Sequence, residues 1–96
     1  MYILLVEYTQ QGIEHVADSA DRFDSARELL EDLGGEHHGM FLTFGQYDQV
    51  HIMEFPDDET AARFILEESS KGWVSTETLK AFPEDDYRDI IQSVAG

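Results

Sequence analysis

Four short apolar segments, interleaved with helical segments in a fixed order, constrain the fold of this chain more than any other feature. The four segments are rich in branched and aromatic side chains, which is typical of β-strands. They span residues 2–8, 36–44, 47–55 and 73–82. Gly45 and Gln46 predict a tight turn between the second and third strands, and Pro56 ends the third.

Three further segments have the apolar spacing of amphipathic helices. They span about residues 13–33, 57–71 and 83–94. The first is expected to break near Asp18 and Ser19, and Gly34 ends it, whereas Asp57 caps the second. The resulting order predicts an α+β domain of the ferredoxin-like βαββαβ type. It has an antiparallel sheet, helices on one face and a short C-terminal helix.

The predicted strands carry apolar side chains on both faces of the sheet. In the first strand, Leu4 and Val6 point to one face, while Ile3 and Leu5 point to the other. Helices in this layout cover only one face, and a large exposed apolar surface usually marks an association site. We therefore expect a homodimer in which two sheets stack face to face. The alternative is that the C-terminal helix folds over the second face within one chain.

Charge is the most unusual property of the composition. The 96 residues, expected to form one domain over 1–96, contain 21 acidic and six basic side chains, for a net charge of −15. Self-repulsion of this size is largely screened at about 1 M salt, where the Debye length falls to about 3 Å. The acidic residues are spread over every predicted helix, which favours adaptation to high salt (a halophilic protein) over an acidic domain that binds a basic partner.

The same composition excludes several classes of function and site. Six scattered basic residues cannot neutralise a phosphate backbone, so direct nucleic-acid binding is excluded. The chain has no cysteine, which excludes disulfides, thiolate metal sites and a cysteine nucleophile. Residues 1–6 are apolar but too short for a membrane span and lack the basic flank of a signal peptide, so we expect a cytoplasmic protein with no membrane partner.

Several short motifs resemble the GYD-domain family, named for its Gly-x-Tyr-Asp turn. The resemblance lies in Tyr8-Thr9-x-x-Gly12, Leu42 to Asp48, Glu54 to Asp58, and Thr76 to Leu79 followed by Ala81-Phe82. It covers essentially the whole chain and implies a ferredoxin-like fold of the dimeric α/β-barrel type, but little about activity. His37, His38, His51 and the strong acidity depart from the family pattern.

The Gly45-Gln46-Tyr47-Asp48 turn is the most distinctive candidate for a site. Gly45 is expected to supply a backbone angle that other residues resist, and Asp48 can hydrogen-bond within its own turn. A purely structural turn is the simpler interpretation. The functional interpretation places Tyr47 and Asp48 at the rim of a ligand pocket or at a dimer contact.

Two neighbouring strands bring histidines into range of one another. A two-residue turn would place Met40 opposite His51, His38 opposite Met53 and His37 opposite Glu54. His38 and His51 would then share one face of the sheet, although a one-residue slip in register would scramble these pairs. Two ligands are fewer than a metal enzyme needs, so we predict no metal site. The simplest interpretation is that His37 and His38 are partly solvated and that His51 is a neutral core or pocket histidine.

Among the strand residues, His51 is the best acid–base candidate, since it titrates near neutrality. The carboxylates of Glu54 and Glu77 lie within strands, where burial is costly unless they are paired, and either could serve as a general base. They face water in the simpler interpretation. Tyr8 and Trp73 could line a ligand pocket or belong to the core or the dimer interface.

These features lead to three hypotheses of function, of which the first is favoured. It is a non-catalytic, homodimeric module that binds a small molecule or regulates a partner, with no cofactor. The second is a cofactor-free enzyme of the dimeric-barrel type, similar by fold to small monooxygenases and isomerases, that uses His51 with Glu54 or Glu77. The third is a structural protein that assembles with others through its sheet edges.

Overall fold

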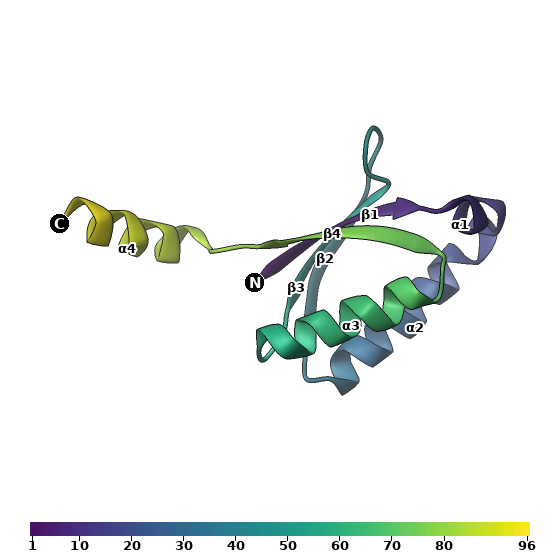
Figure 1. Ribbon diagram of the computed structural model, residues 1–96, viewed down its shortest axis with the longest axis horizontal. Coiled ribbons are helices and arrows are strands. Elements are labelled where there is room, and N and C mark those ends of the chain that lie inside the picture. Colours follow the sequence, from purple (N-terminus) through teal and green to yellow (C-terminus); the bar gives the residue numbers. More distant parts are fainter.

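A four-stranded antiparallel sheet with helices on one face forms the body of the molecule (Figure 1). The computed structural model describes residues 1–96, except for the side chain of Ala95. The strands are β1 (Tyr2–Tyr8), β2 (Glu36–Leu42), β3 (Gln49–Glu54) and β4 (Val74–Lys80), and their order in the sheet is β2-β3-β1-β4. The helices are α1 (Gln10–Glu14), the 3-10 turn η1 (Val16–Asp18), α2 (Ser19–Asp32), α3 (Asp58–Ser70) and α4 (Glu84–Ala95). This is the ferredoxin-like α+β architecture that the sequence predicted.

Local signals explain where the helices begin and end. The hydroxyl of Thr9 accepts the N–H of Gly12 at 3.0 Å and so caps α1, earlier than the sequence pattern indicated. The break expected near Asp18 and Ser19 is confirmed, because η1 ends and α2 begins there. Gly34 ends α2 at a φ of 84°, a left-handed angle that favours glycine. The carboxylate of Asp57 accepts the N–H of Thr60 at 2.8 Å and caps α3.

The hydrophobic core lies between the sheet and helices α2 and α3. Along β1 the burial alternates, so that Leu4 and Val6 point into the core. Leu30 of α2 and Phe64 of α3 are the largest fully buried side chains among the described residues, and Met53 of β3 completes the cluster. This single layer of contacts determines the face of the sheet on which a site can be enclosed.

The opposite, second face of the sheet is apolar at its centre, and none of the described residues forms a layer over it. Its central row runs across three strands, with Phe41 opposite Val50 and Val50 opposite Leu5. The next row pairs Ile52 with Ile3 and Ile3 with Leu79. Carboxylates stand around these rows on the same face, at Glu7, Glu54 and Glu77. Figure 1 shows helix α4 projecting away from the body, so the alternative in which this helix folds over the second face is not adopted.

Helix α4 leaves its own apolar residues exposed, together with the aromatic residue that precedes it. These residues are Phe82, Tyr87, Ile90, Ile91 and Val94, with exposed fractions from 44% to 80%. The apolar stripe predicted from sequence spacing is therefore present, but in the described part of the molecule it is not packed against the sheet or the other helices.

Two details of the β2–β3 hairpin differ from the predictions. The prediction of a tight two-residue turn is wrong. Strand β2 ends at Leu42 and β3 begins at Gln49, so a longer loop over residues 43–48 joins them. The pair Met40–His51 is confirmed, but a β-bulge between His37 and Gly39 shifts the register beyond it. His37 therefore pairs with Met53, and Glu36 pairs with Glu54. The predicted pairs His38–Met53 and His37–Glu54 are both wrong.

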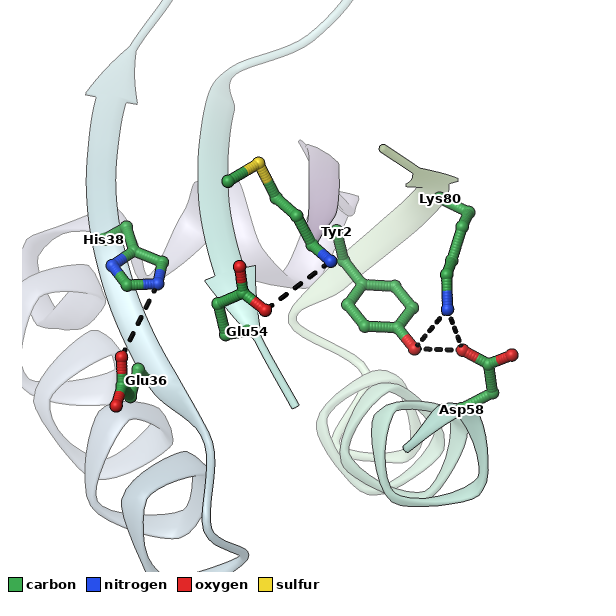
Figure 2. A network of polar contacts seen from close by, with 7 residues as sticks. Tyr2, Glu36, His38, Glu54, Asp58 and Lys80 are labelled. Carbon is green, nitrogen blue, oxygen red and sulfur yellow. Dashed lines mark hydrogen bonds and ion pairs between the residues drawn. The ribbon is translucent and has the colours of Figure 1, made fainter. Parts of the chain in front are cut away.

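Polar contacts join the strand ends to helix α3 (Figure 2). The hydroxyl of Tyr2 donates to the carboxylate of Asp58, which also forms an ion pair with Lys80 of β4. The ammonium of Lys80, with the tyrosine hydroxyl, holds the pKa of Asp58 below its ordinary value. Nearby, the N-terminal amine lies 3.5 Å from the carboxylate of Glu54.

Within the described residues, the helices include none that is long and apolar enough to cross a membrane.

Candidate functional site

A cavity of about 490 Å³ lies between the helix-covered face of the sheet and helix α2. Its inner wall is apolar and includes Leu30, Met53 and Phe64 of the core. Side chains from the sheet, the start of α2 and the end of α3 complete the lining. A volume of this order suits a small organic molecule, since ligand pockets typically measure roughly 300–1,000 Å³.

A continuous chain of hydrogen bonds crosses the sheet side of the cavity. The Nε2 atom of His37 lies 3.0 Å from Nδ1 of His51, and Nε2 of His51 lies 2.8 Å from the amide oxygen of Gln49. The amide nitrogen of Gln49 donates to the hydroxyl of Tyr8 at 2.5 Å, and that hydroxyl lies 2.9 Å from Oγ of Ser19. All five residues line the cavity. Their polar atoms satisfy one another across strands β2, β3 and β1 and the start of α2.

Burial keeps the two histidines of this hydrogen-bonded series, His37 and His51, neutral. Loss of hydration lowers the pKa of His51 to about 4, and the nearby His37 and Arg27 add to the effect. The pKa of His37 is lowered by burial first and then by Arg27 and His38. Because the amide oxygen of Gln49 only accepts, a neutral His51 donates from Nε2 and accepts from His37 at Nδ1. Near neutral pH, His51 is thus a hydrogen-bonding group and a weak base.

Two arginines of helix α2 complete the cavity and were not predicted from the sequence. The guanidinium of Arg22 stacks over the Trp73 ring at 4.5 Å and donates from Nη1 to the carbonyl of His15 at 2.9 Å. The guanidinium of Arg27 lies over the Phe23 ring at 4.6 Å. One feature of the sequence could have indicated them. Two of the six basic residues lie within about one and a half turns of the same predicted helix, on either side of the aromatic Phe23.

The protein-family comparison identifies the chain over nearly its full length. The model of the GYD domain matches residues 2–91. The chain belongs to the GYD domain family. A relative from the bacterium Thermus thermophilus, named glutamine synthetase and cystathionine beta-lyase binding protein, is 34% identical over 86 residues, which cover 88% of this chain and 90% of the relative. No solved structure matches the chain significantly.

The GYD turn (residues 45–48) is joined to strand β1 by hydrogen bonds. Gly45 has a φ of 111°, the left-handed angle predicted for it. The backbone N–H of Asp48 donates to the carbonyl of Val6 at 2.7 Å, and its carboxylate accepts the N–H of Tyr8 at 2.8 Å. Tyr47 reaches the second face, where its hydroxyl donates to the carboxylate of Glu77 and this bond raises the tyrosine pKa. Neither Tyr47 nor Asp48 lines the cavity.

The structure thus brings three of the seven predicted site residues to the cavity and leaves the other four outside it. Tyr8, His51 and Trp73 line the cavity. Glu54 and Glu77 lie on the second face, behind the sheet from His51, and strand alternation keeps them there. This separation leaves His51 without either of the carboxylates proposed as its partner in an enzyme. Across the described residues, no group of three metal-ligating side chains is close enough to hold an ion.

Proposed function

We propose that this GYD protein is a cytoplasmic, non-catalytic binding module that forms a homodimer through the second face of its sheet and holds a small molecule in the cavity. The observation that carries the proposal is the two-sided sheet, in which helices enclose one apolar face and no described segment covers the other. The relative from Thermus thermophilus supports a binding role, because its name describes a protein that binds two enzymes.

The composition of the second face favours a second copy of the chain as its occupant. Its central rows are apolar, with Phe41 58% and Leu79 43% exposed. Glu7, Glu54 and Glu77 surround the rows, which gives the apolar centre and polar rim of a protein interface. Sheet-on-sheet stacking about a two-fold axis would cover both copies at once. The projecting α4 carries a further exposed apolar stripe that a neighbouring copy could cover.

Self-association can be tested by light scattering after size exclusion in molar KCl, where charge repulsion is screened. We expect the wild-type protein to have twice its chain mass of 11.0 kDa. A Phe41→Lys variant should have the mass of one chain, since it places a charge in the apolar row that the interface would bury. Leu66→Lys is the matched control, because Leu66 is 70% exposed on α3, away from this face.

Circular dichroism should show the same secondary structure in both lysine variants. A wild-type protein that elutes as one chain would refute the dimer, and so would a Phe41→Lys protein that stays dimeric.

Two candidates for a bound protein partner are the glutamine synthetase and the cystathionine beta-lyase of the same cell. The wild-type protein is immobilised, and binding of each purified enzyme is measured by interferometry. Binding of either enzyme would support the partner role, and a result in which neither enzyme binds would count against these partners.

A further inference from the structure

The distribution of positive charge singles out the cavity. Four of the six basic side chains each form an ion pair with a carboxylate: Arg63, Lys71, Lys80 and Arg88. Within the described part of the chain, the two others, Arg22 and Arg27, form no ion pair with a carboxylate. Both line the cavity. Arg22 is half-buried and Arg27 is exposed to solvent. Although the chain has 21 acidic residues, these two arginines leave positive charge at the cavity that an anion from outside the chain can pair with.

Arg22 is held in place with one donor unsatisfied. Stacking on Trp73 and the bond from Nη1 to His15 fix the guanidinium plane. The Nη2 atom is buried and has no hydrogen-bond partner among the described residues. A buried donor on a charged group is unfavourable without an acceptor, so this atom calls for an oxygen that the chain does not supply.

The acidic residues at the cavity do not provide that oxygen. Glu68 forms an ion pair with Lys71 at 2.8 Å, so its carboxylate is not paired with either arginine. The same ion pair neutralises Lys71, the third basic side chain that lines the cavity. Asp18 and Asp21 line the cavity too, but they are exposed to solvent and pair with neither arginine. The chain of neutral groups from His37 to Ser19 already satisfies its own polar atoms. The arginines are therefore the groups left to bind a ligand.

We propose that the cavity binds a small organic carboxylate, with its carboxylate on Arg22 and Arg27 and its apolar body against Leu30, Met53 and Phe64. A guanidinium presents paired donors that match a carboxylate or a phosphate. A net charge of −15 and the two exposed aspartates at the cavity disfavour a doubly charged phosphate more than a singly charged carboxylate. This inference rests on the ligand-binding part of the proposed function and is independent of the dimer.

The only tryptophan of the chain provides a direct readout, because Trp73 lies under Arg22 and lines the cavity. The probe is 4-phenylbutyrate, titrated at about 0.5 M KCl with tryptophan excited beyond the absorption of the phenyl ring. The uncharged analogue 4-phenyl-1-butanol tests whether the charge is recognised. We expect saturable quenching or enhancement with the carboxylate and a dissociation constant about tenfold higher for the alcohol, since hydrogen bonds to charged groups are the strong ones.

Matched variants separate the cavity arginines from the overall charge. Arg22→Met and Arg27→Met should each weaken 4-phenylbutyrate binding about tenfold, while Arg63→Met should change it less than about twofold. Arg63 lies exposed on α3, so this control alters the net charge equally but leaves the cavity untouched. Amide chemical shifts of the variants establish that each is folded, and ligand-induced shifts in Arg27→Met map the contact if Arg22→Met does not fold.

Several outcomes would overturn the inference. Equal binding of acid and alcohol would show that charge is not recognised, and equal weakening in all three methionine variants would show that only the net charge acts. Tighter binding of phenyl phosphate than of the carboxylate would assign the site to phosphate esters instead. An absence of saturable binding by the carboxylates hexanoate and 4-phenylbutyrate at up to 20 mM would refute the site, whatever mass light scattering assigns to the protein.

Discussion

Acidification should destabilise the protein through one buried imidazole. His51 is 4% exposed, and burial lowers its pKa to about 4 in the folded protein. In the unfolded chain the same group has a pKa of about 6.5. Because the folded pKa is the lower one, the unfolded chain binds the proton first as the pH falls. The stabilisation is complete above the unfolded pKa and is lost as the pH falls from there towards the folded pKa.

The magnitude follows from these two pKa values. Proton linkage between about 6.5 and about 4 lowers the free energy of unfolding by about 2 kcal/mol between pH 7 and pH 5. The carboxylates of this acidic chain also begin to titrate in this range and relieve charge repulsion, which acts in the opposite direction. A variant that lacks only the imidazole therefore provides the reference.

His51→Gln is that variant, because its amide nitrogen can still donate to Gln49 as Nε2 of the imidazole does. Urea unfolding in constant molar KCl, followed by circular dichroism, gives the free energy of each protein at a series of pH values. The difference between wild type and His51→Gln should shrink by about 2 kcal/mol from pH 7 to pH 5. The matched control is His38→Gln, at an exposed histidine of the edge strand. Parallel pH curves for wild type and His51→Gln would refute the buried neutral imidazole.

Two further predictions concern the GYD turn and the net charge. Asp48→Ala removes the acceptor of the Tyr8 N–H and should lower the melting temperature by roughly 6–24 °C, for a loss of about 1.5–3 kcal/mol. Asp24→Ala, on α2 away from the turn, removes the same charge and should not lower it; equal melting of the two variants would show that the turn contact contributes nothing. The melting temperature of the wild type should rise by more than about 4 °C between dilute buffer and molar KCl, because a net charge of −15 repels itself in dilute buffer. A melting temperature that does not change with salt would remove the proposed adaptation to high salt.

The order and type of the helices and strands could be predicted from the sequence because each depends on neighbours along the chain. The stop at Gly34 and the cap at Asp57 act within one turn of the residues that they affect. Strand alternation likewise predicted the apolar second face, since successive side chains point to opposite sides of any strand. The GYD motifs agreed with this architecture and with the family comparison.

The candidate site depended on contacts that no local pattern contains. The bulge between His37 and Gly39 adds one residue to β2 and turns His37 towards His51, and a bulge has no reliable sequence signal. The importance of Arg22 and Arg27 is that they lack carboxylate partners, a property of the folded arrangement and not of either residue. The projection of α4 is also a tertiary result, because the same apolar stripe would suit a helix packed on its own sheet. Periodicity along the chain determines which side of an element is apolar, but only the packing of distant elements decides what that side contacts.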